Sequence, residues 1–395
     1  MSNGLNKTTK PTIGILMELN EKWMGGVNYI INLIKVLSFA PVEQLPRIVL
    51  LAREDVPDYF RILVEKSVFL EIHYLKRCNP PAELKGEELY STIWRHRSSQ
   101  VKQAIEKLSI DFLFPVIDPR DLDMPTAIIG WIPDFQHKYM PDFFQESEIL
   151  ARNSTYTQFA NKAEFMLFSS NATLQDFRKF YPQFKSRNFV YHFCTVLDQN
   201  RSMQPINYLQ NKYGLSENFF YLPNQFWAHK NHRTVFETIY ALKQTGCQIE
   251  LVCTGTTFDY RNVNYVNQLM NYKDEMGLDN IKVLGLIPAE DQAQLYYHTK
   301  AVIQPSLFEG WSSIVEDARA FNKRIILSDI PVHREQNPER AIYFDPTNKN
   351  DLIEKIRLVL DESISTELYQ DLIEKQAGYV KQTAASLLKI FDSLI

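Results

Sequence analysis

The feature of this sequence that most restricts its fold is the alternation of short apolar runs with longer stretches of helical periodicity. Such runs lie at 12–17, 47–51, 69–75, 111–117, 127–132, 165–170, 189–193, 219–222, 249–254, 281–284, 301–304, 325–327 and 342–346. Short apolar runs separated by helices are typical of buried parallel strands. The pattern therefore predicts an α/β protein with helices on both faces of parallel sheets.

The length of the chain indicates more than one domain. At 395 residues it exceeds what one hydrophobic core usually supports, so we expect two domains. Residues 196–206 are polar and lack periodicity, which is typical of a linker. We place the first domain at 1–200 and the second at 206–375, followed by a helix over 376–395.

Composition excludes several classes of partner and compartment. The net charge is −4 and no long basic run occurs, so a nucleic-acid partner is not expected. Four scattered cysteines favour a reducing compartment and neither a disulfide framework nor a metal site. Residues 1–11 are polar, and no apolar stretch reaches the ~18 residues of a spanning helix. We expect a cytoplasmic protein, and peripheral contact with the inner face of the membrane stays open.

The most informative segment runs from Gln304 to Asp329. It predicts a strand end, a turn at Glu309-Gly310-Trp311, a helix that opens at Ser312-Ser313, and a second strand. The first amides of a helix lack internal partners and attract an anion, while Glu309 beside them would bind hydroxyl groups. The segment thus predicts a site for a polyhydroxylated group linked to phosphate. It also fits an ordinary strand, turn and serine-capped helix.

Helical periodicity separates two adjacent acids in this segment. At about 100° per residue, Asp317 borders the apolar face of the helix, whereas Glu316 points nearly opposite. Asp317 is therefore the expected second carboxylate of the site, and Glu316 is expected to be exposed to solvent.

This segment resembles a known family. The run PSLFEGW, the acid at Asp317 and the run SDIPVHRE at 328–335 resemble the C-terminal signature of retaining nucleotide-sugar glycosyltransferases, glycosyltransferase family 4. The resemblance implies the GT-B fold, in which two Rossmann-like domains face each other across a cleft and a C-terminal helix returns to the first domain. Two residues depart from the family pattern. Asp317 replaces a glutamate, which shortens its reach to the nucleotide ribose, and Ser312 replaces a glycine where donor phosphates approach the backbone.

A second segment, PNQFWAHKNH at 223–232, offers a cation. Lys230 follows a strand and precedes a helix, where its ammonium would neutralise a diphosphate, although a solvated surface lysine also fits. The resembled family brackets the donor diphosphate with an arginine and a lysine. Lys230 corresponds to the lysine, but Gln225 stands in the place of the arginine. Gln225 can still donate hydrogen bonds but carries no charge, so either the affinity for the donor is lower or a nearby group such as His229 compensates.

Two glycine turns are further candidates for donor binding. Gly25-Gly26 follow the first strand and open a helix, a geometry that lets phosphate approach the backbone. The resembled family has a glycine-rich loop here. Gly285-Leu286-Ile287 follow a later strand, and similar enzymes bind the nucleotide base with the backbone of this turn. Each of these two segments also fits a simple turn.

The loop after 127–132 provides candidates on the acceptor side. Asp134 and His137 would lie at the carboxyl end of a parallel strand, where ligands of such sheets bind. His137 would handle a proton or hydrogen-bond an acceptor hydroxyl, or it is simply a surface histidine. The resembled family often has a His-Asp pair on this loop, in a different order and spacing.

The resemblance implies transfer of a sugar from a nucleotide-diphosphate donor to the hydroxyl of a glycan or other acceptor, with retention, in polysaccharide biosynthesis. Lys230, the helix amides at Ser312-Ser313 and the Gly26 amide would stabilise the leaving charge, Glu309 would position the donor sugar, and Asp317 would hold the ribose. No Asp-x-Asp cluster suited to holding a divalent ion on the diphosphate is evident, so no metal or other cofactor is expected to be required.

Two other functions remain open from the sequence. The departures at Gln225 and Ser312 also fit a protein that binds a nucleotide sugar or glycan without catalysis, and the same fold would support a nucleotide-sugar epimerase. The donor sugar, the base, the acceptor and the oligomeric state cannot be read from these residues.

Overall fold

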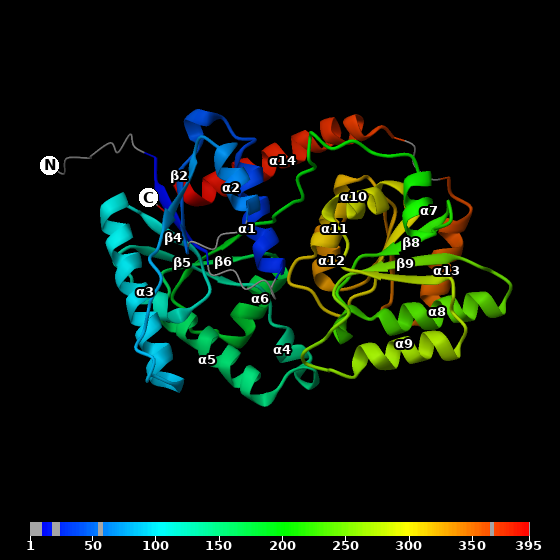
Figure 1. Ribbon diagram of the computed structural model, residues 1–395, viewed down its shortest axis with the longest axis horizontal. Coiled ribbons are helices and arrows are strands. Elements are labelled where there is room, and N and C mark those ends of the chain that lie inside the picture. Colours follow the sequence, from blue (N-terminus) through cyan, green and yellow to red (C-terminus); the bar gives the residue numbers. More distant parts are fainter. Residues whose placement is uncertain (1–9, 18–23, 54–57, 364–366, 395) are drawn as a thin grey trace.

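The strands of this chain form two parallel sheets that lie side by side along the molecule (Figure 1). The structure is a computed structural model and describes residues 10–17, 24–53, 58–363 and 367–394. This architecture confirms the predicted α/β class with two Rossmann-like sheets.

The first sheet has the strand order β3-β2-β1-β4-β5-β6-β7, and every neighbouring pair is parallel. Its strands are β1 (Thr12–Leu16), β2 (Arg47–Ala52), β3 (Leu70–Tyr74), β4 (Phe112–Val116), β5 (Ala127–Ile132), β6 (Phe165–Phe168) and β7 (Arg187–Val190). The helices of this half are α1 (Met24–Leu37), α2 (Asp58–Glu65), α3 (Gly86–Leu108), α4 (Gln136–Tyr139), α5 (Glu146–Lys162) and α6 (Asn171–Phe180), with short 3-10 helices η1 (Val42–Gln44), η2 (Pro119–Asp123) and η3 (Pro141–Phe143).

The second sheet has the order β10-β9-β8-β11-β12-β13 and is also parallel throughout. Its strands are β8 (Phe219–Leu222), β9 (Glu250–Thr254), β10 (Ile281–Gly285), β11 (Ala301–Gln304), β12 (Ile325–Ser328) and β13 (Ala341–Phe344). The helices are η4 (Ala228–Lys230), α7 (Asn207–Tyr213), α8 (His232–Gln244), α9 (Tyr265–Glu275), α10 (Ala289–His298), α11 (Ser313–Ala320), α12 (Pro331–Gln336), α13 (Lys349–Leu360) and α14 (Tyr369–Asp392).

Each sheet is buried on both faces, as the apolar runs require. In β5, Ile128 and Ile132 join one apolar cluster, whereas Ile129 and Trp131 join the cluster on the opposite face. Successive strand residues point to opposite faces, so a strand that is apolar at every position needs helices on both sides.

The end of β7 differs from the sequence prediction. The expected strand 189–193 is instead Arg187–Val190. Beyond Tyr191 the chain leaves the sheet, and Phe193 and Cys194 pack into two different apolar clusters. The apolar residues after Val190 therefore bury their side chains in tertiary contacts outside the sheet.

The last helix joins the two halves. In Figure 1, α14 runs from the second sheet across to the first. Its final turns place Leu387, Leu388, Ile390 and Phe391 in the apolar cluster that also contains β1 residues.

Helix α14 also packs on α11, and this contact overturns one prediction. Glu316 is 1% exposed, because Tyr379 of α14 covers it and Arg319 and Gln336 bond to it. A helical wheel of α11 alone could not predict the burial of Glu316, because the covering side chain comes from α14.

Candidate active site

The strand order marks one crevice in each sheet. In an open parallel sheet, ligands bind outside the carboxyl ends of the two strands between which the strand order reverses. In the second sheet these strands are β8 and β11, and in the first they are β1 and β4. Lys230 follows β8 and Glu309 follows β11, so both predicted residues belong to the crevice of the second sheet.

Lys230 and Glu309 are in direct contact. The Nζ atom of Lys230 lies 2.5 Å from Oε1 of Glu309, and the two side chains are only 15% and 10% exposed. The turn that carries Lys230 is fixed to the neighbouring loop, because the amide of Leu307 donates to the carbonyl of His229 at 2.8 Å. The structure therefore brings together the cation and the carboxylate that the sequence singled out separately.

A chain of amide side chains holds Glu309 in place. Asn224 donates to Oε1 of Gln304 at 2.6 Å, and Gln304 donates to Oε1 of Glu309 at 3.1 Å and to Oγ of Ser312 at 2.9 Å. Asn224 and Gln304 are fully buried. Sequence analysis assigned no role to either, although a polar residue at the end of a buried strand is a signal that could have found them.

His333 is also fully buried, and it is close enough to Glu309 for the charge of that carboxylate to act on its ring. Its Nδ1 is 3.0 Å from Oγ of Ser328. Burial lowers the pKa of His333 to about 4, against the opposing charge of Glu309, so the ring is neutral at pH 7. The histidine of the run SDIPVHRE therefore contributes a buried, neutral ring and no positive charge.

The helix start at Ser312 follows the predicted position but not the predicted capping. Helix α11 begins at Ser313, yet the Ser312 side chain makes no capping bond, because its Oγ accepts the hydrogen bond from Gln304. The Ser312 amide donates to Oε1 of Gln336 at 3.2 Å. The Ser312 hydroxyl is thus tied to the Glu309 network, and ordinary N-capping does not explain it.

Asp317 lies at the junction with the first domain. Its Oδ1 accepts a 2.5 Å hydrogen bond from Oγ1 of Thr195, a residue of the segment between the two sheets. Burial raises the pKa of Asp317 to about 6, although the Thr195 hydroxyl and the charge of Lys35 oppose this rise. The carboxyl therefore titrates close to neutrality.

The Glu309-Gly310-Trp311 turn touches the first domain. A Cβ atom on Gly310 would collide with the carbonyl oxygen of Pro133, in the loop after β5. The Trp311 ring stacks on His192 at 4.5 Å between centroids, and its Nε1 donates to the carbonyl of Phe193 at 2.9 Å. Gly310 and Trp311, which were predicted as donor-binding residues, thus form a contact between the two halves in this structure.

Glu335 makes a second contact between the halves. Its carboxylate accepts hydrogen bonds from the amides of Asn171 at 2.6 Å and Ala172 at 2.9 Å, at the start of α6, and lies 2.7 Å from Nε2 of His192. A carboxylate is stabilised by the free amides of a helix N-terminus. The run SDIPVHRE therefore also has a role in joining the domains.

The acceptor-side candidates are enclosed by side chains. Oδ1 of Asp134 accepts from the amide of Gln136 at 2.9 Å and pairs with Arg152 at 3.7 Å. His137 is 1% exposed, and its Nε2 lies 3.1 Å from Oδ1 of Asn153. Burial lowers the pKa of His137, so the ring is neutral at pH 7. In this closed arrangement the ring does not face an open site.

The remaining candidates lie at the expected edges of the sheets. Gly25 and Gly26 fall inside the first turn of α1, which begins at Met24 instead of after the glycines. Their amides are still among the first of the helix. Gln225 is partly buried after β8. Gly285 ends the edge strand β10, and Leu286 beyond it is 73% exposed, while Ile287 packs against an apolar cluster.

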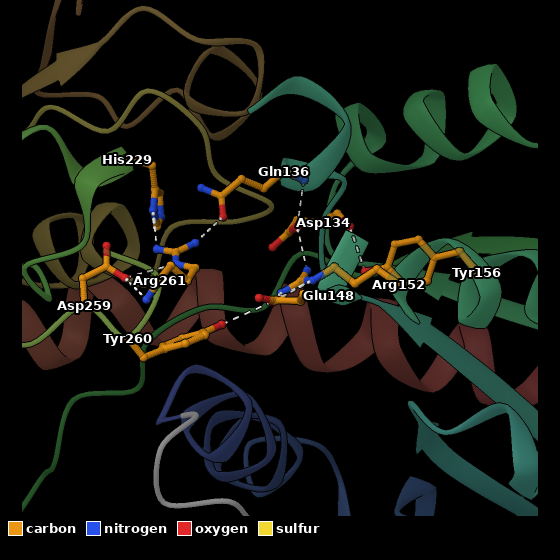
Figure 2. Close-up of polar contacts among 9 residues, drawn as sticks. All are labelled: Asp134, Gln136, Glu148, Arg152, Tyr156, His229, Asp259, Tyr260 and Arg261. Atoms are coloured by element: carbon orange, nitrogen blue, oxygen red, sulfur yellow. Dashed lines mark hydrogen bonds and ion pairs between the residues drawn. The ribbon is translucent and has the colours of Figure 1, made fainter. Parts of the chain in front are cut away.

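Sequence analysis missed an arginine next to this site. Figure 2 shows Arg261, from the loop after β9, among Asp259, His229 and Gln136. Its side chain is 3% exposed, and its nitrogen atoms lie 3.2 Å from Oδ1 of Asp259, Oε1 of Gln136 and Nδ1 of His229. The loop has no helical or strand periodicity, so no pattern drew attention to it.

A metal site and a membrane-spanning helix are both absent from the part of the chain that the structure describes. No group of three or more His, Cys, Asp or Glu side chains is arranged to hold a metal ion. None of the described helices combines the length and apolar character that crossing a bilayer demands.

Part of the chain matches a known family by sequence. Residues 209–378 match the family described as Glycosyl transferases group 1, and the match includes both Lys230 and Glu309. A search of curated protein sequences found no match. The resemblance inferred from the sequence motifs is confirmed for this part of the chain.

Solved structures match nearly the whole chain. Sucrose-phosphate synthase from Thermosynechococcus elongatus has a TM-score of 0.69 at 14% identity, covering 98% of this chain and 99% of that one. HepE from Anabaena in complex with UDP-glucose has a TM-score of 0.67 at 14% identity, with 96% and 99% covered. WaaG, a glycosyltransferase involved in lipopolysaccharide biosynthesis, has a TM-score of 0.60 at 10% identity, with 96% and 99% covered. These similarities confirm the GT-B fold.

Proposed function

We propose that this chain, a GT-B protein whose residues 209–378 form a Glycosyl transferases group 1 domain, is a retaining glycosyltransferase. It transfers a hexose from a nucleotide-diphosphate sugar to a hydroxyl group of a glycan or other acceptor, in glycan or polysaccharide biosynthesis. The observation that carries the proposal is the contact of Lys230 with Glu309 where the strand order of the second sheet reverses.

In this proposal Lys230 changes partner when the donor binds. Its ammonium leaves Glu309 for the diphosphate, where it and the first amides of α11 stabilise the negative charge of the leaving group. Glu309, held by Gln304, then accepts hydrogen bonds from hydroxyl groups of the donor sugar. The assignment gives Lys230 the larger effect on nucleotide binding and Glu309 the larger effect on turnover.

The remaining residues have supporting roles in the proposal. Asp317 accepts hydrogen bonds from the nucleotide ribose, and the turn at Gly285-Leu286-Ile287 contacts the base. The amide of Gly26 approaches the diphosphate from the first domain. The loop that contains Asp134 and His137 forms the acceptor side of the cleft.

The bond changes follow from retention. The bond between the anomeric carbon and the diphosphate oxygen breaks, and its electron pair leaves with the diphosphate. The acceptor oxygen bonds to the same face of that carbon, and its proton passes to the departing phosphate oxygen. Because Lys230 and backbone amides meet the developing charge, the proposal assigns no metal ion to this step.

A panel of nucleotide sugars tests the donor class. UDP-glucose is the first donor to try, because HepE, which shares the fold, was solved with it. A ligand that binds only the folded state raises the melting temperature, so the panel ranks sugars and bases directly. Transfer to glycan acceptors is then followed by mass spectrometry and NMR in the presence of EDTA. A donor that binds and is transferred with retention supports the proposal, whereas no binding by any nucleotide sugar contradicts it.

One observation favours binding without catalysis as the second candidate. The site has a neutral Gln225 where the family has an arginine, and the buried Ser312 hydroxyl lies where the family has a glycine. A nucleotide sugar that binds but is neither transferred nor hydrolysed would favour this function. A sugar that changes configuration while still linked to the nucleotide would indicate an epimerase.

A further inference from the structure

The loop after β9 joins the donor side of the cleft to the acceptor side. Tyr260 and Arg261 belong to this loop, in the second domain. The Tyr260 hydroxyl donates to Oε1 of Glu148 on α5 at 3.3 Å, and Nη1 of Arg261 donates to Oε1 of Gln136 on α4 at 3.2 Å. Both partners belong to the first domain, so the loop bridges the two sheets (Figure 2).

Arg261 also lies directly behind the turn that carries Lys230. Asp259, which pairs with Arg261, accepts a 3.0 Å hydrogen bond from the amide of Ala228, the first residue of η4. Nη2 of Arg261 lies 3.2 Å from the ring of His229, the residue before Lys230. The guanidinium stacks 4.8 Å above the ring of Trp227. A displacement of Arg261 therefore acts on Lys230 through the turn itself.

The contact across the domains is incompletely satisfied. Gln136 is 6% exposed, and its Oε1 accepts the bond from Arg261, but its Nε2 has no partner among the described residues. Burying an amide donor without a partner costs free energy of the same order as a hydrogen bond to a charged guanidinium contributes. The net free energy of forming this contact is therefore small, which suits a contact that forms and breaks during turnover.

We propose that Arg261 is a positioning residue that couples closure of the two domains to the placement of Lys230. The inference rests on the proposed glycosyltransferase function. In the open state Arg261 keeps Asp259 and His229 and loses Gln136. In the closed state it gains Gln136 and brings the loop of Asp134 and His137 against the donor turn. The three fixed donor directions of a guanidinium suit one group that serves three partners, and lysine cannot replace it.

This assignment separates turnover from nucleotide binding. Apart from the Gly26 amide, the proposed nucleotide contacts lie in the second domain, so losing the Gln136 contact leaves the affinity for UDP within about twofold. The closed state needed for transfer is lost, so kcat falls about tenfold. A residue that only stabilised the second domain would change both quantities or neither.

A double-mutant cycle across the interface tests the coupling. The variants are Gln136→Ala, Arg261→Lys and the double variant, with Arg233→Ala as control because Arg233 is an exposed arginine of the same domain on α8. Each single variant lowers kcat about tenfold, the double variant is within about twofold of Arg261→Lys, and the control matches wild type. If Gln136→Ala leaves kcat unchanged, or if the two losses multiply to about a hundredfold, the proposal is overturned.

Hydrogen–deuterium exchange supplies a readout that does not need turnover. Arg261→Lys raises exchange in α4, which belongs to the other domain, whereas Arg233→Ala does not. Unchanged exchange in α4 overturns the coupling even if the wild-type protein transfers sugar. If Arg261→Lys raises exchange in α4 but the wild-type protein transfers no sugar, the coupling is supported and only the proposed function is refuted.

Discussion

The donor-side and acceptor-side candidate residues are held in different ways. On the donor side, Lys230 and Glu309 lie within one domain and are held by buried amide side chains. On the acceptor side, His137 packs among aromatic rings, with centroids 5.4 Å from Tyr156 and 6.4 Å from Phe144, and is neutral. In the proposed function, the donor half is therefore already prepared for a charged ligand, whereas the acceptor half depends on how its loop meets the second domain.

The largest expected effect comes from the prepared half. Glu309→Gln keeps the size of the side chain but removes the charge that pairs with Lys230 and would orient the donor sugar. We expect the rate of sugar transfer to fall by about 10²–10³, as for other groups that act on the transition state. Initial rates with saturating donor measure this effect.

Glu237→Gln is the matched control for this variant. Glu237 also pairs with a cation, Arg233, but on a partly exposed helix face. Its rate should equal that of the wild type, because exposed i,i+4 pairs contribute about 0.3–0.5 kcal/mol to stability and nothing to the cleft. Equal rates for Glu309→Gln and wild type would show that the donor half is not prepared for catalysis.

The next effect falls where the two halves meet. Gly310→Ala places a methyl group against the carbonyl of Pro133, so the domains cannot close fully. We expect kcat to fall about tenfold to a hundredfold while UDP affinity stays within about threefold. Gly378→Ala in α14 is the control, since its methyl group meets nothing and should raise stability by about 0.5–1 kcal/mol. If Gly310→Ala weakens UDP binding as much as turnover, the separation of the two halves is wrong.

The donor half should also respond to pH through Asp317. Burial raises the pKa of Asp317 to about 6, so the carboxylate that would bind the ribose becomes protonated below that pH. We expect wild-type affinity for UDP to weaken severalfold from pH 7 to pH 5, and the affinity of Asp317→Asn to be weaker and to vary less. Calorimetric titration at both pH values measures this.

Stability should change in the same pH range. The folded pKa of Asp317 lies above its ordinary value, so the carboxyl favours the folded state at low pH, and this contribution is lost as pH rises through about 6. The free energy of unfolding of Asp317→Asn, relative to wild type, should therefore increase between about pH 4 and pH 6 and then level off. A difference that is constant with pH would contradict the raised pKa.

The smallest effect is expected in the enclosed acceptor half. His137→Asn removes a buried ring that bonds to Asn153, and should lower the free energy of unfolding by about 1–2 kcal/mol. Because the ring is neutral and enclosed, kcat should change less than about threefold and its pH profile should keep its shape. A large loss of kcat with normal stability would instead assign His137 to proton transfer.

The fold was largely predictable because its signals are local. The strands at 127–132, 219–222 and 301–304 occur at the predicted bounds, since short apolar runs between helices have few alternative structures. The end of β7 was misplaced because Phe193 and Cys194 are apolar for tertiary reasons. The exposure of Glu316 was wrong for the same reason, since its cover comes from α14, more than fifty residues later.

The candidate site was predictable where one segment carried the signal. Lys230 and Glu309 each follow a strand and precede a helix, so each could be found from its own neighbourhood. Arg261 could not, because its partners come from three elements and its loop has no periodicity. The contact of Gly310 with Pro133 was also invisible, because it depends on how the two domains meet.

In the proposed function, Lys230 binds the diphosphate of the nucleotide donor. Calorimetric titration of UDP and of uridine into wild type, Lys230→Ala and Lys355→Ala tests it most directly, since Lys355 pairs with Asp351 on the surface of α13. We expect Lys230→Ala to weaken UDP binding at least tenfold, because a charge contact to phosphate is lost, and to change uridine binding little. The variant Lys355→Ala should behave as wild type. UDP binding by Lys230→Ala that equals wild-type binding would contradict the claim.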